Sequence, residues 1–498
     1  MNVTESPAPA VIVVSGAGVL SEQPVIQETS APTITLPVTQ KRRLVESAVL
    51  FVSAILLLRT VAVEPFGVPT GSMAPSLCGN HRALACPRCG YPIRVGEPTN
   101  RQSGYPDTQC LNCGAESLAV AAASEIAGDR LLVDKNVFRL RSPRRWEVAV
   151  FICPSDKSKP YVKRIVGLPG EQVRLHDGDV WINGELARKN LSQARGCRIP
   201  VFEADYSPPT GWGMRWYPDG TPAPLVASEM PKLPEWMSLD GNALVVNSQN
   251  TTAPRLAAYW QVSHDSGMPE VIRDGFEYNG HGSPAHDYAV HDFILECEVE
   301  VLAGEGFVGL KLTDGAETAT AQIAAGGEFG ESKMLVGANG LVKTANRPPL
   351  KLGGKYRVEM AFVDRRVSVA VEGKEYFSHD LPAGVRREDV ISPFRLGGQG
   401  VQLRFDHIRL YRDIFYRAGE KTAAHTPYQL GTDEFFLLGD NSAHSDDSRF
   451  WKIPGVPERN FLGKPFLLHQ PSRPGLLTVG GKTMHSQSID WGRIRWLR

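Results

Sequence analysis

The residues best suited to chemistry lie in three short segments that are far apart in the chain. The first is Pro69-Thr70-Gly71-Ser72-Met73-Ala74-Pro75, where a serine stands in a turn framed by glycine and proline. The second is Tyr161-Val162-Lys163-Arg164, a strand-like run that ends in Gly167-Leu168-Pro169-Gly170. The third is Gly439-Asp440-Asn441, which continues into Ser445-Asp446-Asp447-Ser448-Arg449. A serine and a lysine together can form a nucleophile and its general base.

That chemistry would be attack by the Ser72 hydroxyl, with Lys163 taking its proton. An unperturbed lysine is neutral in only ~4 molecules per 10,000 at pH 7, so Lys163 must be buried to act as a base. Lowering its pKa by about three units costs roughly 4 kcal/mol. Its neighbours Val162, Ile165 and Val166 are apolar and favour such burial. His444 is the alternative base, but a single histidine without an orienting partner is more often a loop side chain.

Together and in this order, these segments resemble the successive motifs of signal peptidase I, the Ser-Lys protease family that removes secretory signal peptides. The strings that carry the resemblance are GSMAPSL, YVKRIVGLPGE and GDNSAHSDDSRFW, with GDRLLVDK and VPERNFLGKP in support. The resemblance implies that Ser445 orients the Lys163 amine. It also implies that the backbone N–H of Ser72 and the hydroxyl of Thr70 hold the oxyanion. Asp447 and Arg449 are implied as a buried ion pair that fixes the Ser445 loop.

The same resemblance implies shallow apolar pockets that select the small residues of an A-x-A cleavage site. The residues implied to line them are Phe66, Val68, Leu77, Tyr161 and Val162, and a role in core packing is compatible with this. Arg145-Trp146-Glu147 departs from the family's usual Arg-Gly-Asp, and Ser442 stands where the family commonly has Arg. Neither position carries chemistry, so we expect altered local packing and retained catalysis.

Four clustered cysteines form a second constellation, Cys86-x2-Cys89 and Cys110-x2-Cys113, with a glycine after each pair. The spacing predicts a zinc ribbon with four thiolate ligands, a structural site. Two disulfides are the alternative, which an extracytoplasmic location would favour. Cys78, Cys153, Cys197 and Cys297 show no pairing pattern and are expected to be core thiols. No cofactor is expected for catalysis, and NSAHSDDS lacks the spacing of an EF-hand calcium loop.

Before these segments lies a candidate membrane helix. Residues 44–63, LVESAVLFVSAILLLRTVAV, follow the basic triplet Lys41-Arg42-Arg43 and can cross a hydrocarbon core of ~30 Å. We predict a transmembrane anchor over 41–64, with a buried helix of a soluble domain as the alternative. The positive-inside rule then places residues 1–40, expected to be a disordered tail, in the cytoplasm. The rest of the chain would lie on the outer face of the cytoplasmic membrane, in contact with lipid.

The remainder of the chain is predicted to be mainly β. A signal-peptidase-like β-barrel or sheet is expected over 65–195 and 420–498, with the zinc-ribbon-like insert at 85–114. Between these parts, residues 292–302, 355–374 and 401–413 alternate apolar and polar side chains. They predict an antiparallel β-sandwich inserted over 196–419. Its late strand FDHIRLYRD resembles those of concanavalin-like or laminin-G-like jelly rolls.

The balanced charge, with 54 basic and 54 acidic residues, gives no case for a nucleic-acid partner. We predict a membrane-bound serine endopeptidase that removes signal peptides from exported precursor proteins. The alternative is a membrane-tethered β-sandwich that binds glycans or proteins on an inactive protease scaffold. The joint presence of Ser72, Lys163, Thr70 and Ser445 favours catalysis. A self-cleaving repressor of the same chemistry is disfavoured, because no helix-turn-helix segment is evident.

Overall fold

The computed structural model describes most of the chain as two compact units, Met1–Leu57 and Leu58–Arg498. The residues described are 38–98, 105, 108–116, 118–207, 215–221, 232–262, 268–280, 288–328, 330–337, 340–418, 422–479 and 482–497. As predicted, the protein is mainly β. The α-helices within these ranges are α1 (Val38–Val61), α2 (Val137–Leu140) and α3 (Leu191–Cys197). The 3-10 helices are η1 (Gly71–Met73), η3 (Val120–Ala122), η4 (Ala204–Tyr206), η6 (Glu277–Asn279), η8 (Ser442–His444), η9 (Glu458–Asn460) and η10 (Trp491–Arg493).

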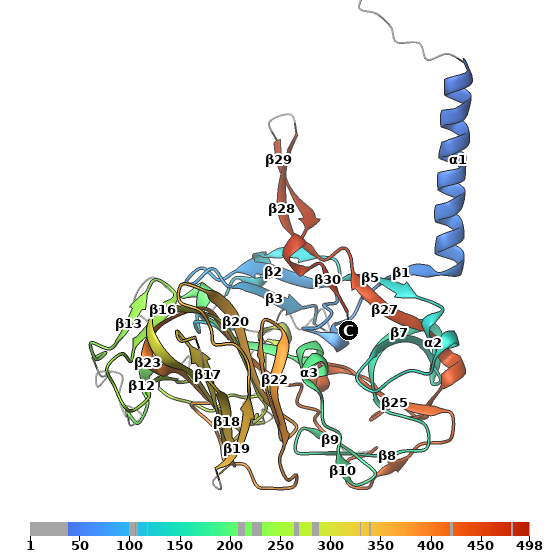
Figure 1. Ribbon diagram of the computed structural model, residues 1–498. Helices are drawn as coiled ribbons and strands as arrows, with labels where there is room; N and C mark the ends of the chain where they lie inside the picture. The colour runs from blue at the N-terminus through green and yellow to red at the C-terminus, as the bar shows by residue number, and fades with distance from the viewer. Residues whose placement is uncertain are drawn as a thin grey trace, which may run out of the picture. The chain divides into compact units, whose positions relative to one another are not determined.

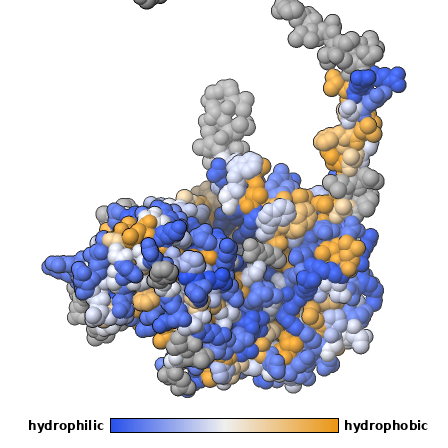
Figure 2. All heavy atoms as spheres, in the orientation of Figure 1, coloured by the Kyte–Doolittle hydropathy of each residue, from blue (hydrophilic) through white to orange (hydrophobic). Residues whose placement is uncertain are grey.

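Most of the first unit's described structure belongs to α1 (Figure 1). The predicted helix is therefore present, and an ion pair between Arg42 and Glu46, at 2.8 Å, spans one of its turns. Hydrophilic residues gather toward the start of this helix and hydrophobic residues follow them (Figure 2). Its charged residues are Lys41, Arg42, Arg43, Glu46 and Arg59. No helix among the described residues is long and apolar enough to cross a membrane, so the predicted transmembrane anchor is not supported.

In the second unit, an eight-stranded antiparallel sheet has the order β1-β5-β27-β6-β7-β25-β26, with β30 paired to β27 (Figure 1). Its strands are β1 (Val63–Gly67), β5 (Arg130–Asp134), β6 (Val148–Cys153), β7 (Asp156–Gly167), β25 (Glu434–Leu438), β26 (Val456–Pro457), β27 (Phe461–Leu468) and β30 (Arg495–Trp496). β25 pairs with β7, and β27 lies between β5 and β6. Segments from the two ends of this unit therefore build one sheet.

The same two ends of the unit also share a four-stranded sheet, β10-β9-β8-β24. Its strands are β8 (Gln172–His176), β9 (Asp179–Ile182), β10 (Glu185–Leu186) and β24 (Tyr428–Gln429). In the larger sheet, β6 (VAVFIC) and β25 (EFFLL) are rich in β-branched and aromatic residues and are almost entirely buried. Strand β7 begins exposed and ends buried, so it carries the side chains of its second half into the interior.

Residues 199–412, called the central segment below, form a thirteen-stranded sheet around one apolar core. Two long strands, β16 (Phe293–Thr313) and β23 (Phe394–Arg412), pair with each other, and five of the other strands pair with one of these two. The other strands are β11 (Ile199–Glu203), β12 (Trp216–Pro218), β13 (Met237–Asp240), β14 (Ala243–Asn247), β15 (Arg255–Tyr259), β17 (Thr318–Ala325), β18 (Ser332–Val336), β19 (Leu341–Ala345), β20 (Lys355–Val363), β21 (Arg366–Val371) and β22 (Lys374–Asp380).

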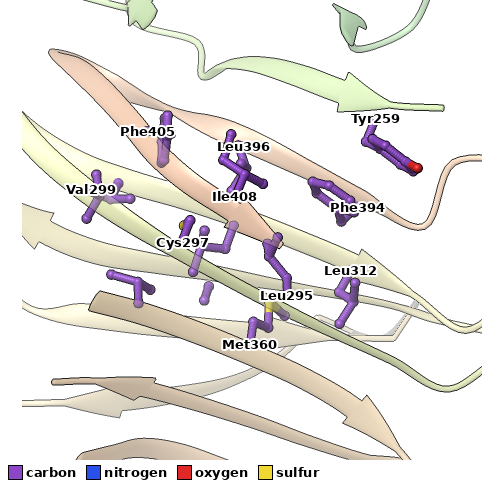
Figure 3. Packing of buried hydrophobic residues seen from close by; sticks show 14 of the residues in the cluster. Tyr259, Leu295, Cys297, Val299, Leu312, Met360, Phe394, Leu396, Phe405 and Ile408 are labelled. Atoms are coloured by element: carbon purple, nitrogen blue, oxygen red, sulfur yellow. The ribbon is translucent and has the colours of Figure 1, made fainter. Parts of the chain in front are cut away.

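Two strand predictions for this segment are confirmed. The alternating residues of 292–302, among them Leu295, Cys297 and Val299, point into the core (Figure 3). The predicted hairpin at 355–374 is formed by β20 and β21. Its two-residue turn, Asp364-Arg365, has φ values of 49° and 57°, the conformation that suits the twist of a tight hairpin.

Two small sheets complete the unit. One has the order β3-β2-β4, from β2 (His81–Ala85), β3 (Pro92–Gly96) and β4 (Ser124–Ile126). The other is a hairpin of β28 (Ser472–Val479) and β29 (Lys482–Ile489). The predicted core thiols Cys78, Cys153, Cys197 and Cys297 are all buried and unpaired.

Candidate active site

Strand β7 places Lys163 in the protein interior, where only 2% of the residue is exposed. Its Nζ donates a hydrogen bond to Ser445 Oγ at 3.1 Å. Burial lowers the pKa of Lys163 from 10.5 to about 8, against the opposing charges of Asp447 and Asp446. A lysine with this pKa is neutral in roughly a tenth of molecules at pH 7, so its amine is available as a base.

A buried ion pair orders the loop that carries Ser445. Arg449 binds Asp447 through two hydrogen bonds, from Nε at 2.8 Å and from Nη2 at 2.7 Å. Burial by itself raises the pKa of Asp447, but Arg449, Lys163 and the backbone N–H of Gly439 together offset this and hold that pKa below its ordinary value. Asp447 also accepts from the backbone N–H of Gly439 at 3.0 Å. The charge of Asp447 favours the charged form of Lys163, and burial of the amine outweighs this effect.

Ser72 is half-buried in η1, against the loop that follows β25. The backbone N–H of Asn441 donates to Ser72 O at 3.1 Å, and Asn441 Nδ2 donates to Gly71 O at 2.9 Å. A Cβ at Gly439 would lie 2.1 Å from Ser445 Oγ and 2.4 Å from Ser72 O. Glycine at 439 therefore allows the Ser445 hydroxyl and the Ser72 backbone to lie close together. The structure brings Ser72, Lys163 and Ser445 into one region.

The other residues implied by the resemblance lie around this region. Thr70 is exposed and extended (φ −112°, ψ 155°) immediately before η1. Four of the five implied pocket residues pack in one apolar cluster with Met73, namely Phe66, Val68, Leu77 and Val162. Tyr161 instead belongs to the neighbouring cluster, where its ring meets Trp451 edge-on at 5.9 Å.

Three further loop positions bear on the sequence interpretation. His444, the alternative base, has an exposed side chain, as has Asp446. Ser442, which stands where the family commonly has Arg, is buried, and its Oγ accepts from Arg449 Nη1 and from the backbone N–H of Arg417, each at 2.8 Å. Ser442 thus helps to hold the guanidinium that pairs with Asp447.

A second buried ion pair was not assigned a role from the sequence. Arg164 binds Asp440 through Nε at 2.7 Å and Nη2 at 2.6 Å, with side-chain exposures of 2% and 0%. Arg164 Nη1 also donates to Trp146 O at 2.7 Å. Trp146 has φ 71°, a conformation that glycine adopts readily, and it stands where the resemblance places a Gly. The ring of Trp146 is buried beneath Lys189, whose Nζ lies 4.1 Å from the ring centroid.

Two residues of the central segment also contact this site, and sequence analysis did not anticipate them. Tyr278 donates through its hydroxyl to Asn80 O at 3.3 Å. Asn279 exchanges two hydrogen bonds of 2.8 Å with Asn441. No local pattern marks either residue, because 162 positions separate Asn279 from Asn441.

The four clustered cysteines converge beside the β3-β2-β4 sheet. Their sulfur atoms all lie within 4.8 Å of one another, and the closest pairs are Cys86–Cys113 at 3.5 Å and Cys89–Cys110 at 3.6 Å. These separations exceed the disulfide bond length of about 2.05 Å, and all four thiols are free. Gly90 and Gly114 have φ values of 78° and 71°, which close a tight turn after each pair. Tetrahedral zinc with bonds of about 2.3 Å places its sulfurs roughly 3.8 Å apart, so the four residues fit this ion.

Comparison with known proteins supplies independent evidence. Residues 119–207 match the family described as signal peptidase, peptidase S26, a segment that contains Lys163 but not Ser72 or Ser445. Signal peptidase I of Pseudomonas fluorescens is 33% identical over 144 residues, which are 29% of this chain and 37% of that protein. Probable signal peptidase I-2 of Synechocystis is 43% identical over 72 residues, which are 13% of this chain and 33% of that protein. The chain thus spans 33–37% of the length of these relatives.

Among solved structures, the carbohydrate binding module CBM66 from Bacillus subtilis matches 34% of this chain and 85% of its own, with 13% identity and a TM-score of 0.21. A similarity this weak indicates nothing about function. The sequence relatives, by contrast, share the name of the family whose motifs surround Ser72, Lys163 and Ser445. They confirm the predicted resemblance: this chain is similar to signal peptidase I.

Proposed function

We propose that this chain is a serine endopeptidase of the signal peptidase I type, which removes signal peptides from exported precursor proteins. The observation that carries the proposal is the state of Lys163. Its amine is buried, its pKa is lowered to about 8, and it lies 3.1 Å from the Ser445 hydroxyl. A buried lysine amine with a lowered pKa, beside a serine-bearing turn, is the arrangement that a Ser-Lys dyad requires.

In the proposed mechanism, Ser72 Oγ attacks the carbonyl carbon of the scissile peptide bond while Lys163 Nζ takes the hydroxyl proton. The backbone N–H of Ser72 and the hydroxyl of Thr70 donate to the oxyanion that forms. Lys163 then gives its proton to the departing amine, which leaves an ester on Ser72. A water molecule, deprotonated by Lys163, hydrolyses the ester and restores the Ser72 hydroxyl. Ser445 accepts a hydrogen bond from Lys163 throughout and so directs the amine.

We assign substrate selection to the apolar cluster beside Ser72. Phe66, Val68, Leu77 and Val162 pack together there, and Val68 and Leu77 are almost fully buried. A densely packed apolar surface excludes large side chains and favours small ones such as alanine, which suits an A-x-A cleavage site. Tyr161 packs against Trp451 and supports β7 from the neighbouring cluster.

For the four-cysteine cluster, we propose a structural zinc site held by Cys86, Cys89, Cys110 and Cys113. Its support is the convergence of four free thiols at separations that match a tetrahedral ion. When bound, zinc would join the two cysteine turns. The ion would have no part in peptide cleavage.

The proposed activity can be tested with the purified full chain and a synthetic precursor peptide that contains an Ala-x-Ala site. Wild-type protein is expected to cut once, directly after this site. Ser72→Ala and Lys163→Met are expected to lower kcat at least ~1,000-fold, because each removes one member of the dyad. Cleavage is measured by mass spectrometry of the products.

The matched controls are Ser76→Ala, four positions from Ser72, and Lys157→Met, at an exposed position of the same strand as Lys163. Both are expected to retain wild-type kcat. Cleavage by Ser72→Ala or Lys163→Met at the wild-type rate would exclude the dyad. The absence of cleavage by wild-type protein would exclude the peptidase itself.

A further inference from the structure

We propose that Asn279, in the central segment, is a positioning residue for the peptidase site and acts through Asn441 on the turn that carries Ser72. The inference rests on the proposed function. It makes the central segment a part of the catalytic apparatus, although that segment lies between the chain's catalytic motifs and resembles none of them.

The two asparagines form a closed amide pair. Asn279 Nδ2 donates to Asn441 Oδ1, and Asn441 Nδ2 donates to Asn279 Oδ1, each at 2.8 Å. Asn441 Nδ2 also donates to Gly71 O at 2.9 Å, and the backbone N–H of Asn441 donates to Ser72 O at 3.1 Å. Asn441 is 1% exposed, so these protein groups take the place of water around its carboxamide. Through Asn441, the Asn279 amide is connected to both residues at the start of η1.

The Gly71 carbonyl sets which way the Asn441 carboxamide faces, and the pair with Asn279 stabilises that orientation. With Asn279 present, the NH2 group of Asn441 donates to Gly71 O, and Asn441 Oδ1 accepts a hydrogen bond from Asn279. A rotation by half a turn would place that oxygen against Gly71 O, where neither group can donate. Without Asn279, the buried Asn441 Oδ1 loses this donor, and the preference for the productive orientation weakens. The position of Ser72 would then be less well defined.

Tyr278, the residue before Asn279, holds the same segment against the nucleophile turn. A Cβ on Gly71 would lie 2.3 Å from Tyr278 Cε1, and a Cβ on Gly96 would lie 2.4 Å from it. The tyrosine ring therefore fits between two glycines, one beside Ser72 and one at the end of β3. This packing fixes where η6 lies, so the Asn279 amide meets Asn441 in a single arrangement.

The contacts that hold Lys163 do not include this pair. Its amine donates to Ser445 Oγ, and the Ser445 loop is ordered by Asp447 and Arg449. Loss of Asn279 should therefore displace the nucleophile without changing the pKa of the base. A general loosening of the site would change both the position of the nucleophile and the pKa of the base. The pH–rate profile therefore distinguishes the two cases.

The experiment uses the full chain and the Ala-x-Ala peptide. Asn279→Ala is expected to lower kcat by about 10- to 100-fold, because small displacements of a reacting group cost about this much. KM is expected to stay within about twofold, the acidic limb of the pH–rate profile to keep its wild-type midpoint, and Tm to stay near the wild-type value. In an Asn441→Ala background, Asn279→Ala should add no further loss. The matched control is Asn242→Ala, which removes an amide that donates to Asp205 O in the same segment.

The outcomes separate this inference from the proposed function. If wild-type protein does not cleave the peptide, the proposed function fails. If wild-type protein cleaves it and Asn279→Ala has the same kcat, the inference alone is overturned. The inference also fails if the two asparagine losses multiply in the double variant, or if Asn279→Ala shifts the acidic limb. Loss of activity in Asn242→Ala would show that any disturbance of the central segment lowers activity, and this too would overturn the inference.

Discussion

At the scale of single residues, the decisive quantity is the proton affinity of Lys163. Burial lowers its pKa from 10.5 to about 8 although three carboxylates, of Asp447, Asp446 and Asp440, oppose the change. Such a shift is also a cost to folding. Between about pH 8 and 10.5 the unfolded chain binds more protons than the folded chain, so stability rises with pH in that window. Below pH 8 the full penalty of roughly 3 kcal/mol remains, at 1.36 kcal/mol per unit of pKa.

The Lys163 pKa of about 8 also predicts the pH dependence of cleavage. Because only the neutral amine accepts the Ser72 proton, kcat/KM should rise about tenfold per pH unit below pH 8 and level off above it. The measurement is the rate of cleavage of a peptide without titratable groups between pH 5.5 and about 9.5. An acidic limb with a midpoint below 6.5 would instead indicate His444 as the base, because burial and the charge of Arg417 lower the pKa of His444 from the ordinary histidine value.

At the scale of secondary-structure elements, the two cysteine turns and the β3-β2-β4 sheet form a small module with little apolar core of its own. The buried residues of its cluster include the cysteines themselves, with Tyr91, Ile93 and Val95. Small modules of this kind are commonly stabilised by a metal, because their hydrophobic surface is too small. The module also borders the candidate active site, since the backbone oxygen of Asn80, directly before β2, accepts a hydrogen bond from the Tyr278 hydroxyl.

Metal removal is therefore expected to act on this module. Purified protein should contain about one zinc per chain, and a strong chelator should lower its Tm and make the two cysteine turns accessible to protease. Cys89→Ser should reproduce the effect, and chelator should then have no additional effect on that variant. Metal-free protein in which the four cysteines form two disulfides would contradict the zinc proposal.

At the scale of the second unit, a buried charge cluster joins the central segment to the eight-stranded and four-stranded sheets. Lys189, just before α3, donates to Asp413 at 2.7 Å and to both oxygens of Asp364 at 3.1 Å. Its Nζ also lies above the Trp146 ring. Arg387 of the central segment reaches back to Asp179 in β9 at 3.0 Å. These contacts are fully or largely desolvated, so removing one partner leaves a buried charge without its counterion.

Lys189→Met should consequently lower the free energy of unfolding by about 3–5 kcal/mol, because Asp364 and Asp413 would lose their shared cation. Urea unfolding, followed by tryptophan fluorescence, measures this change. Lys355→Met is the matched control, since its side chain is 55% exposed and its carboxylate partners lie 3.5 and 3.7 Å away. The control should change stability by less than about 1 kcal/mol. Equal effects of the two substitutions would show that the buried cluster does not join the segments.

The sequence by itself determined the features that depend on neighbouring residues. The order of side chains along 292–302 and 355–374 predicted strands, because alternation places every second residue on one face. The C-x2-C pairs with their glycines predicted two turns that aim four sulfurs at one point. The strings around Ser72, Lys163 and Ser445 indicated signal peptidase I, and the sequence relatives support that resemblance.

Only the tertiary structure decided which distant residues meet, because pairing across long stretches of chain leaves no local pattern. Lys163 and Ser445 are 282 positions apart, and burial of the amine arises from packing against the loop after β25. The Asn279–Asn441 pair and the cluster around Lys189 likewise join segments that share no motif. In α1, a helical sequence was interpreted as a membrane anchor, but no helix among the described residues is long and apolar enough to cross a membrane. The order of neighbouring residues predicts secondary-structure elements and candidate functional groups. Desolvation and pairing set the chemistry of those groups, and both are properties of the folded chain.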